Sequence, residues 1–348
     1  MRLIRLGDYS QEVADVQARL RELGFDIDDK PATFGDSTRR AVMAFQQRRG
    51  ILSDGIVGTN TWGELVEAGW RIGDRVLYVA RPYMRGDDVL ALQARLNALG
   101  FNAGREDGIF GRDTDGAVRA FQHEYAIEED GIFGVRSHAA LQGLRVDRPM
   151  TASGLREELA RSQRQGGMQG VLIMIDPGHG GTDLGDRSPL GSFEGDLCWD
   201  ICLHLAAILG QGGARVRLSR TEAEGPGATE RAMRANTSGA EVFLSIHLNS
   251  HTEPNAEGAS TYYFPRSQSG EVLAEAIRDD LVELGLRDCR SHARSYSILK
   301  ETRMPAVLVE PAFITNPDEA KLLEEGDFRR TIAQAIATGV RGYLEEGV

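Results

Sequence analysis

The N-terminal part of the chain contains the same pattern twice. The segment VQARL at 16–20 recurs as LQARL at 92–96, and AVMAFQ at 41–46 recurs as AVRAFQ at 117–122. The offset is 76 residues in both cases, and it holds for the Leu-Gly-Phe and Asp-Gly-Ile matches of the same region. An ungapped register of this length indicates a duplicated folding unit, so the fold of one copy is predicted to be the fold of the other.

Each copy has the periodicity of a small helical domain. In the first copy Val13, Val16 and Leu20 fall at helical spacing, and Gly24 stands where a helix is expected to end. The AVMAFQ segment predicts a second helix, and an Asp-Gly turn leads into a short third helix around 62–65. We therefore predict a compact all-α unit of three helices for each copy.

The sequence predicts four consecutive parts along the chain. We expect the two helical domains at residues 1–72 and 77–146. Between 147 and 170 the apolar pattern thins and polar residues dominate, which is typical of a linker. A third domain is expected at 171–348, where strands and helices alternate.

The third domain has the pattern of an α/β fold. Strands are predicted at 171–175, 216–218, 242–246, 260–264 and 306–310. Between the first two lies a helix with an apolar face, and the last helix carries apolar residues at steps of four from Phe328 to Val340. Such alternation predicts a mostly parallel sheet flanked by helices.

Composition and charge exclude several classes of protein. Apolar residues make up 41% of the 348 and charged residues 26%, which are values of soluble globular proteins. No apolar stretch approaches the ~18 residues of a membrane span. The net charge is −12, with 20 basic against 23 acidic residues in 1–150 and 20 against 29 in 151–348. Neither part offers a positive field, so we expect no nucleic-acid partner.

Chemically capable side chains stand at three predicted strand ends. His179 and His247 each follow an apolar run, Glu310 ends another, and Glu194 heads the helix after the first strand. Ligands of open α/β sheets gather at this edge. Two imidazoles and one carboxylate form a recurrent set for catalytic zinc, and a remaining carboxylate serves as general base, for which Glu310 is the candidate. These residues alone leave open which carboxylate ligates and which catalyses.

The duplicated unit resembles a known family. Its LQ-x-x-L-x-x-LGF, AV-x-x-FQ and DGI-x-G motifs resemble the peptidoglycan-binding domain found on bacterial cell-wall hydrolases. The resemblance implies that at least one copy binds the cell wall, with peptidoglycan or its precursors as the partner. The matching residues are core and turn positions that define the fold, so an architectural or protein-docking role is the alternative.

Residues 171–345 resemble the zinc-dependent N-acetylmuramoyl-L-alanine amidase family. The matching motifs are IDPGHGG at 175–181, FEGDL at 193–197, SR at 219–220, SIHLNS at 245–250, MPAVLVE at 304–310 and FITNP at 313–317, with Arg231 to Asn236 between them. The resemblance implies one Zn²⁺ held by His179, Glu194 and His247, with Glu310 as the catalytic acid/base. The implied reaction hydrolyses the amide between N-acetylmuramic acid and L-alanine of the stem peptide by a zinc-activated water.

Several nearby residues carry weaker expectations. Asn249 lies two residues beyond His247 and is a candidate substrate contact. Asp176 is expected either to accept a hydrogen bond from a ligand histidine or to cap the loop. We expect His204, His251 and His292 to lie on the surface.

Two positions depart from the family pattern. Gly195 replaces a basic residue after Glu194, and Glu310 is followed by Pro311 and Ala312 where the family has a glycine. Because proline lacks a backbone donor and alanine resists positive φ, the loop after Glu310 is predicted to differ in conformation. This supports the alternative of a weakly active or inactive amidase-like regulator that senses peptidoglycan precursors and docks on cell-wall synthesis proteins.

The first ten residues, MRLIRLGDYS, carry charges and have no apolar core of a signal peptide. A cytoplasmic location is therefore expected, or action at the cell wall after release or non-standard export.

Overall fold

A computed structural model describes residues 2–144 and 167–345 of the protein. The chain divides into two compact units, Met1–Arg156 and Glu157–Val348, and each is described by itself. Most of the predicted linker at 147–170 lies outside the described residues. None of the helices in the described part has the length and apolarity that a membrane span needs.

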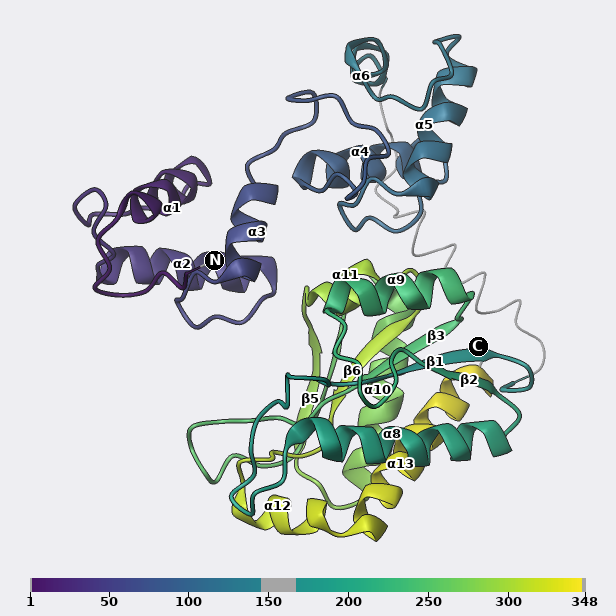
Figure 1. Ribbon diagram of the computed structural model, residues 1–348. Coiled ribbons are helices and arrows are strands. Elements are labelled where there is room, and N and C mark those ends of the chain that lie inside the picture. The colour runs from purple at the N-terminus through teal and green to yellow at the C-terminus, as the bar shows by residue number, and fades with distance from the viewer. Residues whose placement is uncertain (1, 145–166, 346–348) are drawn as a thin grey trace. The chain divides into compact units, whose positions relative to one another are not determined.

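The first unit is all-helical, in two sets of three helices (Figure 1). The first set is α1 (Gln11–Glu22), α2 (Asp36–Arg49) and α3 (Thr59–Glu67), and the second is α4 (Asp87–Ala98), α5 (Arg112–Glu124) and α6 (Val135–Gln142). Each set has its own apolar core, with Phe45 fully buried in one and Phe121 in the other. The predicted pair of three-helix units is confirmed.

The glutamine of each AV-x-x-FQ motif holds its unit together. The side-chain amide of Gln46 donates to Oδ1 of Asp54 at 2.8 Å, and its carbonyl accepts from the backbone N–H of Gly55 at 2.9 Å. Gln122 makes the same two bonds, to Asp130 and Gly131, at 2.8 and 2.9 Å. The motif therefore joins the second helix to the Asp-Gly turn, which explains why both recur together.

The second unit is a six-stranded mixed sheet in the order β2-β1-β3-β6-β4-β5. The strands are β1 (Leu172–Pro177), β2 (Arg215–Leu218), β3 (Val242–Ile246), β4 (Ala259–Tyr263), β5 (Asp288–Ala293) and β6 (Ala306–Glu310). The first four in this order run parallel, and β4 pairs antiparallel with β6. The five predicted strands are present, whereas β5 was not predicted because its polar sequence, DCRSHA, lies at the sheet edge with no apolar run.

Helices cover both faces of this sheet (Figure 1). The helices are α8 (Glu194–Gln211), α9 (Ala228–Ser238), α10 (Gln268–Glu283), α11 (Ser297–Glu301), α12 (Pro317–Glu324) and α13 (Gly326–Glu345). The larger apolar core lies between the sheet and α8, α10 and α13, and the smaller one lies under α9 and α11. Since both faces are covered, all residues of β1 and β3 are buried, as their unbroken apolar runs predict.

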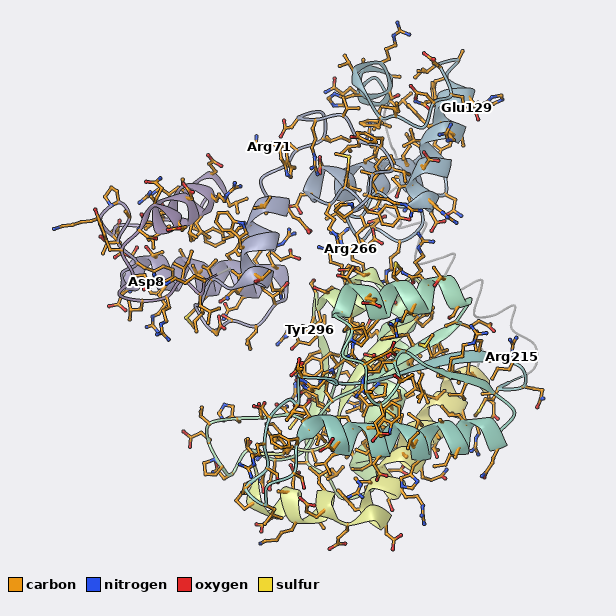
Figure 2. The ribbon with its side chains drawn as sticks, in the orientation of Figure 1. Asp8, Arg71, Glu129, Arg215, Arg266 and Tyr296 are labelled. Atoms are coloured by element: carbon orange, nitrogen blue, oxygen red, sulfur yellow. The ribbon has the colours of Figure 1, made fainter. Side chains whose placement is uncertain are left out.

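Figure 2 labels one residue near each edge strand of the sheet, Arg215 in β2 and Tyr296 after β5. Arg215 opens β2 and pairs with Leu172 at the start of β1. Tyr296 precedes α11, and its ring packs against Tyr262 of β4, next to Glu310 at the end of β6. The end of the sheet near Glu310 is the one where β1 and β3 deliver His179 and His247.

Candidate metal centre

Three predicted ligand residues meet at the carboxyl ends of β1 and β3. His179 lies in the loop after β1, His247 directly follows β3, and Glu194 is the first residue of α8. Nε2 of His179 and Nδ1 of His247 each lie 3.0 Å from Oε1 of Glu194. One ligand atom from each residue lies within 4.8 Å of the others. Neighbouring parallel strands therefore bring together residues that are 68 positions apart in the sequence.

The donor set fits a zinc ion. Two imidazole nitrogens and one carboxylate oxygen are the ligands of many catalytic zinc sites, which keep another position open. Nδ1 of His179 lies 3.0 Å from Oδ2 of Asp183, an arrangement that leaves Nε2 directed at Glu194. Glu194 is buried and accepts from the backbone N–H groups of Leu248 and Asp186, at 3.0 and 3.2 Å. Its carboxylate is therefore fixed on both oxygens.

The charges of the site suit a cation. Burial opposes a charged imidazole, but the hydrogen bonds and charges of Glu194 and Asp183 outweigh it and raise the pKa of His179 to about 9. Burial likewise opposes a charged Glu194, whereas its hydrogen bonds with His179 and His247 hold its pKa well below the ordinary range. Because metal ligands must be deprotonated, a cation competes here with protons for the same lone pairs.

The loop that presents His179 is held by two buried arginines. His179 adopts a left-handed conformation, with φ of 56°, which a non-glycine residue keeps only when its surroundings fix it. Arg231 of α9 donates to the carbonyl oxygen of His179 and, at 2.9 Å, to Oδ1 of Asp176. Arg220 donates to the carbonyl oxygens of Pro177 and Gly178, both at 3.0 Å. The two planar guanidinium groups thus donate hydrogen bonds to consecutive carbonyl oxygens of a loop that has no regular secondary structure.

Asp176 supports the loop and does not touch a ligand histidine. Its buried carboxylate accepts from Arg231, from the hydroxyl of Ser219 and, at 2.7 Å, from the hydroxyl of Ser245. Among the described residues no hydrogen bond joins it to His179 or His247. Of the two roles expected for Asp176, the structure favours loop support, and Asp183 is the carboxylate beside His179.

Gly178 is required by the close approach of the loop to the second histidine. A Cβ atom at this position would lie 2.7 Å from the ring of His247 and 2.8 Å from the carbonyl oxygen of Ile246. A side chain here would push against both the ring and a buried strand. The first glycine of the IDPGHGG motif therefore sets the spacing of the two imidazoles.

Glu310 lies beside this group, at the end of the next strand. The backbone N–H of His247 donates to the carbonyl oxygen of Val309 at 2.9 Å, which ties β3 to β6 just before Glu310. Burial raises the pKa of Glu310, with nearby His247 and a hydrogen bond from Tyr262 acting in the opposite direction. A half-buried carboxyl group with a raised pKa beside a candidate metal site has the character of a general acid/base.

The loop after Glu310 does not need a glycine. Ala312 is not among the described non-glycine residues with positive φ, so its methyl group causes no backbone strain. Asn249 pairs with the loop through its backbone, donating to the carbonyl oxygen of Ala312 at 2.9 Å and accepting from Ile314 at 2.8 Å. Glu319 accepts from the N–H of Phe313 at 2.7 Å. The alanine therefore fits this loop, which is supported by the hydrogen bonds of Asn249 and Glu319.

The other three histidines of the second unit lie outside the group formed by the three candidate ligands. His251 is exposed, as expected. His204 was also expected on the surface, but it is half-buried and lies 3.7 Å from a carboxylate oxygen of Asp200. His292 was expected on the surface, but β5 places it half-buried, with its ring centroid 5.6 Å from that of Tyr262. The sequence signal was weak because the edge strand that positions His292 was itself not predicted.

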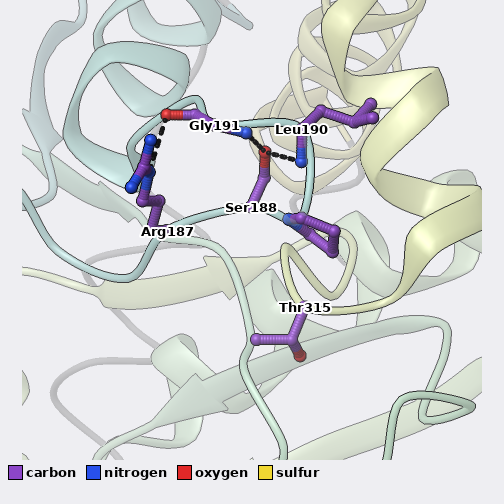
Figure 3. A pocket seen from close by; sticks show the side chains of 6 residues that line it. Arg187, Ser188, Leu190, Gly191 and Thr315 are labelled. Atoms are coloured by element: carbon purple, nitrogen blue, oxygen red, sulfur yellow. Dashed lines mark hydrogen bonds between the residues drawn. The ribbon is translucent and has the colours of Figure 1, made fainter.

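A shallow pocket of about 450 Å³ is lined by Thr315 and by the loop between β1 and α8, which also carries His179 (Figure 3). Arg187 and Thr315 line it on opposite sides, and Ser188 accepts from the backbone N–H groups of Leu190 and Gly191, each at 3.1 Å. The segment that carries Arg187 is joined to the centre, because the N–H of the preceding residue donates to Glu194. The loop between β1 and α8 therefore carries both His179 and the cation of this pocket.

Comparison with known proteins decides the family. Over 97% of its length the chain is 38% identical to the N-acetylmuramoyl-L-alanine amidase CwlM of Mycobacterium tuberculosis and covers 88% of that protein. The chain belongs to the N-acetylmuramoyl-L-alanine amidase family. The model of this family matches residues 173–342, and a peptidoglycan binding domain model matches 9–65 and 85–141.

Other members of the family match about half of the chain. The amidase LytC of Bacillus subtilis is 36% identical over 50% of this chain, which covers 36% of that protein. The crystal structure of the amidase from Clostridium difficile 630 is 34% identical, with a TM-score of 0.49 over 51% of this chain and 98% of that one.

Proposed function

We propose that the protein hydrolyses the amide bond between N-acetylmuramic acid and L-alanine in peptidoglycan. In this proposal His179, Glu194 and His247 hold one Zn²⁺, and Glu310 is the catalytic acid/base. The observation that carries it is the convergence of two histidines and a buried carboxylate at the strand end next to Glu310, in a chain of the amidase family.

The side chains divide the chemistry between them. A zinc ion bound here would polarise the amide carbonyl and lower the pKa of a water molecule towards ~7. Glu310 takes the proton from the attacking water and delivers it to the leaving nitrogen of L-alanine. Its raised pKa suits this double role, because the same group must accept a proton and then give it up.

Two features are proposed to contact the substrate. Asn249 is half-buried two residues beyond His247, and its amide is proposed to contact the glycan or peptide. Arg187 lines the pocket beside the ligand loop, and stem peptides carry free carboxylates, so we assign this pocket to the stem peptide. Arg187→Ala is expected to raise KM for a muramoyl peptide about tenfold with little change in kcat. An unchanged KM would remove Arg187 from the binding site.

The helical units are proposed to be peptidoglycan-binding domains, at residues 1–72 and 77–146, followed by a linker at 147–170 and the amidase domain at 171–348. The family-model matches at 9–65, 85–141 and 173–342 fall inside these bounds. Two binding modules on one chain would hold the enzyme on an insoluble substrate and raise its local concentration there.

The regulatory alternative rests on the changed residues after Glu310. In this loop Ala312 has no positive φ and Asn249 is joined to the backbone of Ala312, so the changes bring no backbone strain. A docking domain also has no need for two histidines and two carboxylates in this arrangement. Catalysis is therefore the function that the site supports better.

The proposal is tested by measuring zinc content and then digesting purified peptidoglycan with wild type and Glu310→Ala. We expect stoichiometric zinc in both proteins and new L-alanine amino termini with wild type alone. Protein that takes up no zinc, or equal inertness of both forms on every wall preparation, would favour the regulatory alternative.

A further inference from the structure

The two oxygens of the Glu310 carboxylate have different surroundings. Oε2 accepts from the hydroxyl of Tyr262 at 3.0 Å and lies 3.4 Å from the hydroxyl of Ser260. Within the described residues, no hydrogen bond reaches Oε1. One oxygen is therefore held by the protein, and the other is left for a different partner.

The sheet explains why these groups meet. Strand β4 runs antiparallel to β6, with Ser260 directly opposite Glu310. Side chains two residues apart on a strand share a face, so Tyr262 lies on the same face as Ser260, diagonally across from Glu310. The hydroxyls of Ser260 and Tyr262 lie 3.2 Å apart and form one small network with the carboxylate.

Aromatic packing holds the Tyr262 ring in place. Its centroid lies 5.5 Å from the ring of Tyr296 and 5.6 Å from that of His292. Burial, followed by the charge of Glu310, raises the pKa of Tyr262 above its ordinary value, so its hydroxyl stays protonated and donates. Within the part of the chain that the structure describes, Tyr296 makes no hydrogen bond to Glu310 and contributes ring packing in the same cluster.

We propose that Tyr262 is a positioning residue for Glu310: its hydroxyl, supported by Ser260, holds Oε2 so that Oε1 faces the reacting water. This inference rests on the proposed function. A carboxylate with one oxygen fixed cannot rotate about its terminal torsion, so its free oxygen keeps the geometry that proton transfer needs.

Kinetics of Tyr262→Phe and Tyr296→Phe on a soluble muramoyl peptide test the inference. Each variant loses one hydroxyl from the same aromatic cluster, but Tyr262 alone donates to Glu310. We expect kcat to fall about 10- to 100-fold in Tyr262→Phe, the effect of losing a hydrogen bond to a charged group, with KM and zinc content unchanged. Tyr296→Phe is expected to keep kcat within about twofold.

A second measurement does not depend on activity. The carboxyl ¹³C resonance of Glu310, assigned by its loss in Glu310→Gln, reports the hydrogen bond to Oε2 directly. It is expected to shift in Tyr262→Phe and to stay in place in Tyr296→Phe. An unchanged resonance in Tyr262→Phe, or active wild type with equal kcat in both variants, would overturn the inference. Inactive zinc-loaded wild type with a shifted resonance would instead contradict the proposed function and leave the Tyr262–Glu310 bond established.

Discussion

Nδ1 of His179 lies 3.0 Å from Oδ2 of Asp183, four residues further along the same loop. The contact fixes the ring so that its other nitrogen faces Glu194. A carboxylate behind a ligand histidine also makes the imidazole a stronger donor to a metal ion. The short loop after β1 therefore supplies both a candidate ligand and the group that orients it.

Asp183→Ala is expected to weaken zinc binding about 10- to 100-fold, because the His179 ring loses its orienting partner. Competition with a chromophoric chelator measures the affinity. Asp186→Ala is the matched control: this acidic side chain lies in the same loop, and only the backbone of Asp186 bonds to Glu194. Equal affinities of the Asp183 and Asp186 variants would contradict the orienting role.

Arg231→Lys is expected to lower the free energy of unfolding of the second unit by about 2–4 kcal/mol. Lysine keeps the charge, but a single ammonium cannot bridge Asp176 and the carbonyls of the His179 loop. Urea denaturation provides the measurement. Arg234→Lys, on the same helix with exposed partners Glu224 and Glu230, is expected to change stability by less than about 1 kcal/mol. Similar losses in both variants would argue against a special role of Arg231.

Glu310→Gln is expected to stabilise the metal-free protein at pH 8 by about 1–2 kcal/mol, or about 2–6 °C in Tm. Burial raises the pKa of Glu310, so the folded state favours its protonated form. The stability that this group contributes is fully present below its ordinary pKa of 4.5 and is lost as pH rises through the raised value. Thermal unfolding across pH should show the gain vanish below pH 4.5. A stabilisation by Glu310→Gln that increases towards low pH would contradict a raised pKa of Glu310.

Gln122→Ala is expected to destabilise the second helical unit by about 2–3 kcal/mol, because the buried N–H of Gly131 and the exposed carboxylate of Asp130 both lose a hydrogen bond. Amide hydrogen exchange of α5, measured in the full chain, reports the stability of this unit separately from that of the rest of the protein. Gln142→Ala, at an exposed position at the end of α6, is the control. Unchanged exchange in the Gln122 variant would show that the motif glutamine is not structural.

Much of the fold was predictable because its signals are local. The repeat at an offset of 76 and the apolar runs of β1, β3 and β6 mark elements whose burial depends on their own sequence. Strand β5 was missed because an edge strand needs backbone pairing with one neighbour and little apolar surface. Because β5 was not predicted, the packing of His292 against Tyr262 could not be predicted either.

The candidate ligands were predictable for a similar reason: His179 and His247 stand at the ends of recognisable strands, and the family motifs include Glu194 and Glu310. The supporting residues were harder to assign. Arg231 bonds to backbone carbonyls 52 and 54 positions away, and Tyr262 reaches Glu310 only through strand pairing. The alternation of Ser260 and Tyr262 on one face was visible in the sequence, but their partner across the sheet was not.

The most direct test of the proposed reaction is mass spectrometry of the products from a soluble muramoyl tripeptide, incubated with zinc-loaded wild type and with zinc-loaded Glu310→Gln. We expect two products from wild type: N-acetylmuramic acid with a free lactyl carboxylate, and the tripeptide with a free L-alanine amine. The Glu310 variant should bind as much zinc and form them at least about 100-fold more slowly. Cleavage at another bond, no cleavage by wild type, or equal rates in the two proteins would contradict it.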